Sequence, residues 1–274
     1  MNNEKMNPEE YRQMKQQERQ EVFDLLSQST QTLLKPEELQ QYLDLQSRFL
    51  QMSASNVLLV KAQNPDATWL RTFEDWKQDN VSIKRGELGL KAMESSYYQK
   101  DDGTMGRSMK VVRLFDISQT TAADRQISRP SYRNAGEYLS EVSGYRTEPS
   151  DVVPEGIDAL WDQERDRICV RPGLDKDREF YVTAREIACR EMAGESRHRD
   201  DVLPYAECAA YMLTKHYGME APVPDLEKLT QHFPGMEEKD VRSELNHAKQ
   251  TAGVLDAKIL EARQRNRDDR ESLR

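Results

Sequence analysis

Residues 53–93 read SASNVLLVKAQNPDATWLRTFEDWKQDNVSIKRGELGLKAM, and within this stretch the period of the apolar residues changes from helical to strand-like. Ser53 or Ser55 can cap a short helix that holds the apolar run 57–60, and Asn64-Pro65 ends it. From Val81 to Lys84 apolar and polar residues alternate, which indicates extended structure. The stretch therefore predicts helices beside a small sheet.

Two strands and two further helices complete this first part of the chain. Residues 90–98 and 109–117 have strand-like patterns, and the loop DDGTMG at 101–106 is typical of a hairpin. Pro8 and Pro36 are each followed by two glutamates, which favours helix starts at both positions. The first part is therefore expected to be an antiparallel hairpin with helices packed on it.

A polar, irregular stretch at 118–134, SQTTAADRQISRPSYRN, marks a boundary. We expect a first domain over residues 1–120, a linker over 121–134 and a second, mostly helical domain over 135–274. The predicted fold class is α+β.

The second domain is expected to contain helices over 135–143, 176–193 and 200–217, with short strands over 159–161 and 167–170. A long helix should follow Gly235. Its apolar residues repeat in steps of four and three, which predicts an intramolecular packing seam or, alternatively, a homodimeric coiled coil: Val241, Leu245, Ala248, Ala252, Leu255 and Ile259. The highly charged end, Arg263 to Arg274, is expected to fray.

The composition and charge limit the classes of partner that the protein can bind. The 274 residues include 40 Lys+Arg and 49 Asp+Glu, with three cysteines and no apolar run long enough to span a bilayer. We expect a soluble cytoplasmic protein with reduced thiols and no membrane partner. The net charge of −9 argues against coating of duplex DNA by charge alone. Residues 41–120 carry 11 basic and 10 acidic residues, net +1, so a polyanion contact is expected there.

The stretch 53–93 followed by KVVRLFDISQT at 110–120 closely resembles the N-terminal domain of ArdC-type antirestriction proteins of Gram-positive mobile elements. The resemblance implies a single-stranded DNA-binding domain joined to a zinc-metallopeptidase-like domain. The residues that match the family pattern in order are Asn56, Gln63, Pro65, Trp76, Gly86, Gly89, Phe115, Asp116, Gln119 and Thr120.

The second half is similar to the family but lacks its metal ligands. Where the family has His-Glu-x-x-His, this chain has Arg185-Glu186-Ile187-Ala188-Cys189, and Glu207 matches a third ligand position. Arg185 has no free lone pair, and Cys189 with Glu207 makes a poor metal site. The pattern predicts a degenerate metallopeptidase-like domain without metal, cofactor or catalytic residues. We expect an Arg185–Glu207 ion pair, with Glu186 as a competing partner and Cys189 as an apolar filler.

The candidate nucleic-acid contacts each have a structural alternative. Trp69 could stack a base or belong to the core, whereas Trp76 is expected in the core. Ser55 and Asn56 could read a strand or cap a helix. The remaining candidates could contact phosphates or belong to a solvated sheet face: Lys84, Arg85, Lys91, Lys110 and Arg113. Alternation places Arg113 with Val111 on one face of the last strand and Lys110 with Val112 on the other.

Three functions remain open at this point. The first is a non-enzymatic single-stranded DNA-binding protein of a mobile or conjugative element, with an antirestriction or DNA-escort role. The second is a pseudoenzyme of the peptidase type that binds a protein partner in its cleft. The third is an active zinc metallopeptidase. The host, the preferred DNA and the oligomeric state are not indicated by the sequence.

Overall fold

The computed structural model describes residues 7–100, 102–125, 135–142, 146–149, 153–194 and 196–272. The fold class is α+β, as predicted. The chain forms two compact units, Met1–Thr32 with Ser55–Ile127 and Leu33–Ala54 with Ser128–Arg274. The segment 33–54, which the sequence analysis assigned to the first domain, thus belongs to the second unit. In the described part of the chain, no helix combines the length and apolarity needed to cross a membrane.

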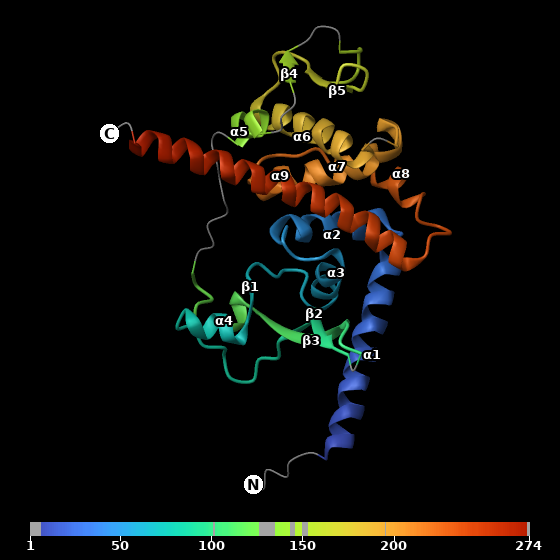
Figure 1. Ribbon diagram of the computed structural model, residues 1–274, viewed down its shortest axis with the longest axis vertical. Coiled ribbons are helices and arrows are strands. Elements are labelled where there is room, and N and C mark those ends of the chain that lie inside the picture. The colour runs from blue at the N-terminus through green and yellow to red at the C-terminus, as the bar shows by residue number, and fades with distance from the viewer. Residues whose placement is uncertain are drawn as a thin grey trace. The chain divides into compact units, whose positions relative to one another are not determined.

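The first unit is built around a three-stranded antiparallel sheet of order β1-β3-β2 (Figure 1). Its strands are β1 (Leu70–Thr72), β2 (Leu90–Gln99) and β3 (Met105–Asp116). Its helices are α1 (Pro8–Thr32), α3 (Ala54–Gln63), α4 (Phe73–Gln78) and the 3-10 turn η1 (Ile117–Gln119). Thr72 caps α4 through a reciprocal pair of bonds with Asp75, which fixes the strand-to-helix junction.

The hairpin is longer than predicted. β3 begins at Met105 instead of residue 109, and its first residues pair with Gln99 and Tyr98. Gly106 permits this extension, because a Cβ there would lie 2.5 Å from the ring of Tyr98. The predicted loop 101–106 therefore shortens, and its outer residues join the ladder.

The second unit combines helices with a small mixed sheet of order β4-β6-β5. The strands are β4 (Arg146–Pro149), β5 (Ala159–Asp162) and β6 (Arg167–Val170); β4 runs parallel and β5 antiparallel to β6. The helices are α2 (Pro36–Arg48), α5 (Ala135–Val142), α6 (Lys176–Ala193), α7 (Arg199–His216), α8 (Leu226–Thr230) and α9 (Glu238–Ser272). The sequence analysis did not predict β1, β4 or α8.

Helix α9 packs along α5, α6 and α7 within this unit. All six residues of its predicted seam are buried, so the intramolecular interpretation is confirmed. The helix continues to Ser272, and the prediction of fraying from Arg263 is wrong. Ala262 is fully buried, so packing reaches the start of the charged segment.

Helix α2 joins the second unit through α7. The hydroxyl of Tyr211 donates to Asp44 at 2.7 Å, and the Nδ1 atom of His216 lies 2.9 Å from the carbonyl of Ser47. Leu39, Leu43 and their neighbours on α2 are buried. These contacts explain why a segment that precedes the first sheet in the sequence belongs with helices that follow it.

Candidate functional site

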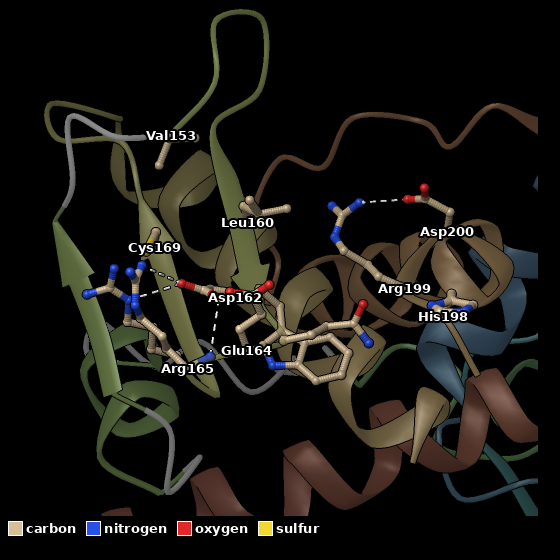
Figure 2. Close-up of a pocket in the computed structure, with 12 residues that line it drawn as sticks. Val153, Leu160, Asp162, Glu164, Arg165, Cys169, His198, Arg199 and Asp200 are labelled. Atoms are coloured by element: carbon tan, nitrogen blue, oxygen red, sulfur yellow. Dashed lines mark hydrogen bonds and ion pairs between the residues drawn. The ribbon is translucent and has the colours of Figure 1, made fainter. Parts of the chain in front are cut away.

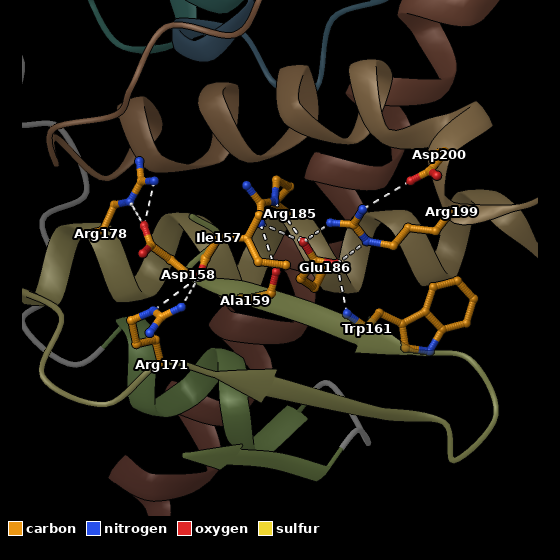
Figure 3. Close-up of polar contacts among 10 residues, drawn as sticks. All are labelled: Ile157, Asp158, Ala159, Trp161, Arg171, Arg178, Arg185, Glu186, Arg199 and Asp200. Atoms are coloured by element: carbon orange, nitrogen blue, oxygen red, sulfur yellow. Dashed lines mark hydrogen bonds and ion pairs between the residues drawn. The ribbon is translucent and has the colours of Figure 1, made fainter. Parts of the chain in front are cut away.

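The centre of the second unit is a buried carboxylate on α6. Glu186 is fully buried and accepts four hydrogen bonds (Figure 3). Its Oε2 atom accepts from the backbone N–H of Trp161 at 2.9 Å and from Nε of Arg199 at 2.8 Å. Its Oε1 atom accepts from Nη2 of Arg199 at 2.7 Å and from Nε of Arg185 at 2.8 Å. The two oxygens have about four acceptor positions, and all are in use.

Arg185 joins α6 to strand β5. Besides Glu186, its guanidinium reaches the carbonyl oxygen of Ala159, to which Nη2 donates at 3.1 Å. The predicted Arg185–Glu207 ion pair is wrong, since Glu207 has no hydrogen bond or ion pair with any described residue. The neighbouring carboxylate and the strand carbonyl hold the guanidinium instead. Burial raises the pKa of Glu207, against the opposing charge of Arg185.

Arg199 is the second cation of this centre, and the sequence analysis did not identify it. Its side chain is only 14% exposed, and it also lies 3.3 Å from Asp200. Burial opposes its charge, but the hydrogen bonds and charge of Glu186 outweigh burial and raise the pKa of Arg199. One signal was available. Arg199 begins α7, where a cation opposes the helix dipole and needs an acidic partner.

The same groups cover the outer edge of β5. The backbone N–H of Arg171 donates to the carbonyl of Asp158. The backbone N–H and carbonyl groups of Asp158 and Leu160 therefore point toward β6, and those of Ala159 and Trp161 point away from it, to the outer edge of β5. The carbonyl of Ala159 and the N–H of Trp161 are then bound by Arg185 and Glu186. Two backbone groups that an added strand would need are therefore already paired.

The residues at the positions of the family's metal ligands do not fit a metal ion. Arg185 is a cation bound to Glu186. Cys189 is fully buried, and burial followed by the charge of Glu186 raises the pKa of its thiol, so it stays protonated. The described residues contain no group of three His, Cys, Asp or Glu side chains that could hold a metal. Cys189 is the apolar filler that the sequence analysis predicted.

A pocket of about 460 Å³ lies beside this centre (Figure 2). Its cations are already matched by acids. Asp162 lies 3.4 Å from both Arg165 and Arg167, and Asp200 accepts from Arg199. The pocket therefore has no net charge preference that would identify an occupant.

In the first unit, Asn56 and Gln63 cover the outer edge of β2. The Asn56 amide accepts from the N–H of Met93 and donates to its carbonyl, both at 2.8 Å. Gln63 makes the same pair with Lys91, at 2.8 and 2.9 Å. Two side-chain amides that are seven residues apart on α3 thus bind two backbone positions that are two residues apart on β2. Asn56, a predicted nucleic-acid contact, has this structural role in the described chain.

Other family-pattern residues also hold the backbone. Asp116 is buried and accepts from the N–H groups of Thr68, Trp69 and Ser118. The indole N–H of Trp76 donates to the carbonyl of Phe115 at 2.9 Å, and Trp76 is buried as predicted. The residues that match the family pattern therefore make the bonds that connect α3, α4 and the sheet in this chain.

Trp69 packs at the edge of the same core. It is half-buried, and its ring meets that of Trp76 edge-on with centroids 5.3 Å apart. Arg71 lies 5.6 Å from the centroids of both rings. Ser55 is half-buried in the first turn of α3. Contact of Trp69 and Ser55 with nucleic acid stays a prediction.

The predicted cations divide between the two faces of the hairpin, as alternation requires. Lys91 lies directly opposite Arg113, and Lys110 lies opposite Glu94 on the other face, at 2.8 Å. Lys91 pairs with Glu21 and Arg113 with Glu18, both from α1. Two further cations lie before the hairpin, where Lys84 donates to the carbonyl of Ser118 and Arg85 is exposed.

The chain is an α+β protein of two units. One unit is built on an antiparallel hairpin, and the other is helical with a small mixed sheet. The particular neighbour is the antirestriction protein ArdC of plasmid R388. Its metal-free crystal structure aligns with a TM-score of 0.58 at 14% identity over 87% of this chain and 98% of ArdC. The Mn(II)-bound structure gives 0.58 at 12% identity over 86% and 98%. The ArdC-like fold inferred from the sequence is confirmed.

A curated relative was also found, the uncharacterized protein pXO2-81 of Bacillus anthracis. It is 22% identical over 97% of this chain, and the chain spans only 56% of that relative's length. No family model matches the chain.

Proposed function

We propose that this chain is a non-enzymatic single-stranded DNA-binding protein of a mobile genetic element, with an antirestriction or DNA-escort role. The antirestriction and mobile-element parts rest on the fold shared with ArdC of plasmid R388 and on the pXO2-81 relative. The DNA-binding and non-enzymatic parts rest on the geometry of the two units.

One face of the β2–β3 hairpin carries the DNA-binding proposal. The continuous antiparallel register puts Lys91, Tyr97, Met105 and Arg113 on the same face. The side chains of Tyr97 and Met105 are 65% and 64% exposed, so both are accessible to a nucleobase. The exposed ring and the cation pair lie at opposite ends of this face, about 20 Å apart by the strand rise. A single strand can reach both, because bases stack on the ring while cations contact phosphates.

The non-enzymatic part rests on Glu186. A general base needs an acceptor position that faces a substrate proton or an activated water. All acceptor positions of this carboxylate are bound by Arg185, Arg199 and Trp161. The proposal therefore assigns Glu186 a structural role as the link between α6, α7 and β5.

The geometry favours DNA binding over the protein-interaction alternative. A peptidase-like cleft binds a polypeptide by adding it to a strand edge, which needs free backbone donors and acceptors. On β5 the outward carbonyl of Ala159 and N–H of Trp161 are already bound. An extended peptide would have to displace a buried ion pair to reach them.

The test is a titration of the full chain with labelled oligo-dT and with duplex of equal length over a series of salt concentrations. We expect the single strand to bind better, with log K falling by about 0.7 per phosphate neutralised as log salt rises. Tyr97→Ala should weaken binding by roughly 5- to 150-fold if one base stacks there. Phe73→Ala, another exposed aromatic of the first unit, serves as the control. Absence of single-strand binding at low salt would overturn the proposal.

A further inference from the structure

The first half of α1 is held to the protein by charge. Among residues 7–21 none is buried, and the helix gains buried apolar contacts only from Val22 and Leu26 onward. Within this stretch Glu18 is half-buried and the other residues are exposed. Figure 1 shows α1, in blue, beside β2 and β3 of the same unit. A helix segment without an apolar anchor depends on its polar contacts.

These contacts are two ion pairs with the cations of the hairpin face. Glu18 lies 2.8 Å from Arg113 and Glu21 lies 2.7 Å from Lys91. The two acids are three residues apart and share one side of α1. The two cations are direct cross-strand neighbours. Like charges in that arrangement repel each other, so the hairpin needs two anions at this place.

The pKa values of Glu18 and Glu21 are lowered, as expected for carboxylates bound to cations. The pKa of Glu18 lies below its usual value because of Lys15, and also because of Arg113, although burial opposes this. The pKa of Glu21 is lowered chiefly by the hydrogen bond and charge of Lys91. Both acids are therefore ionised at neutral pH. α1 presents two negative charges to the hairpin, of which that of Glu18 is shared with Lys15 at 2.9 Å.

We propose that α1 is an acidic strap that occupies the Lys91–Arg113 cation pair and competes with the phosphates of a single strand for it. This inference rests on the proposed DNA-binding function and adds its regulation. Glu18 and Glu21 hold the positions that two phosphates would take, and a bound strand releases residues 8–21 of α1 from the hairpin face.

The strength of the strap suits such a switch. One side chain of each pair is exposed, Glu21 at 50% and Arg113 at 44%, and the other is partly buried, Lys91 at 23% and Glu18 at 16%. Salt therefore screens both pairs in part and weakens them. A single strand offers a row of charges and the release of its counterions, which two carboxylates on a helix cannot match. The strap therefore excludes isolated anions and short strands more effectively than long strands.

The experiment compares oligo-dT binding by the full-length double variant Glu18→Gln with Glu21→Gln against a control of equal charge. The control is Asp66→Asn with Asp124→Asn, because both acids lie outside α1, both are exposed, and neither forms an ion pair with a described residue. We expect the strap variant to bind about 2- to 30-fold more tightly than the control, the effect of releasing two partly exposed ion pairs. The difference should shrink as salt rises, because screening weakens the strap.

Lys91→Gln gives an independent arm, since the Lys91 ammonium pairs with Glu21. It should weaken binding more in a Glu21→Gln background than in the wild-type chain, where Glu21 already occupies it. Hydrogen exchange reports the strap directly. Residues 8–21 should exchange faster in the strap variant than in the control, and faster in the wild type once oligo-dT is added.

The outcomes separate the two proposals. Equal affinities of strap variant and control, or slower exchange of residues 8–21 on adding DNA, overturn the strap while single-strand binding stands. Absence of binding by the wild-type chain at low salt overturns DNA binding and the strap with it. Binding by both chains at low salt, tighter by the strap variant than by the control, supports both.

Discussion

Arg199→Ala tests the charge network around Glu186. The carboxylate is fully buried and receives two of its four hydrogen bonds from Arg199. Truncation leaves a buried carboxylate with only the Arg185 guanidinium and one backbone N–H. Breaking a buried ion pair by removing one partner costs about 3–5 kcal/mol. For a unit of this size class, 1 kcal/mol shifts Tm by about 2–4 °C, so the expected loss is roughly 6–20 °C.

Differential scanning calorimetry of the full chain measures this loss, with the transition of the second unit assigned by hydrogen exchange on α6. Arg165→Ala is the matched control, because Arg165 is 68% exposed and its pair with Asp162 is a surface contact. That variant should lose less than about 1 kcal/mol. The variants Glu186→Ala and Arg199→Ala with Glu186→Ala complete a double-mutant cycle.

We expect the double variant to be less destabilised than the sum of the single variants, because removing both partners leaves no unpaired buried charge on either side of that pair. Strict additivity, or a loss for Arg199→Ala no larger than that for Arg165→Ala, would refute the idea that Glu186 and Arg199 link α6 to α7.

Three further predictions follow from the two units. Replacing Asn56 or Gln63 by Ala should destabilise the first unit by about 1–3 kcal/mol and speed hydrogen exchange at β2, since each leaves one backbone N–H and one carbonyl unpaired; unchanged exchange there would contradict the edge-cap role. Asp116→Asn should cost roughly 1.5–3 kcal/mol at neutral pH. Burial opposes the Asp116 anion, but the N–H groups of Thr68 and Trp69 prevail and lower its pKa. The stability that this anion contributes is therefore present above the unfolded pKa near 3.8 and is lost as pH falls through the folded pKa. The Tm values of variant and wild type should converge in acid, and a difference that persists would contradict this. Adding Zn²⁺ or Mn²⁺ to chelator-treated protein should leave Tm unchanged, and a metal-dependent rise that disappears in Cys189→Ala would show that the donor set does bind a metal.

The elements with strong local signals could be predicted from the sequence. Pro8, Pro36 and the seam of α9 identify helices because proline placement and apolar periodicity act within a few residues. β1 and β4 were missed because each pairs with a strand that is distant in the sequence, β1 with β3 and β4 with β6. The length of the hairpin depended on the contact between Gly106 and Tyr98, which no local pattern specifies.

The sequence by itself determined that the second unit departs from a metal-binding pattern, because Arg185 cannot donate a lone pair whatever surrounds it. The tertiary structure alone decided what replaces the metal. Arg199 and the N–H of Trp161 come to Glu186 from α7 and β5, at sequence distances of 13 and 25 residues. The same holds for Glu18 and Arg113, which are 95 residues apart and meet only when α1 lies beside the hairpin. Charge pairing acts over a few ångströms in space, so it depends on which side chains the fold brings together.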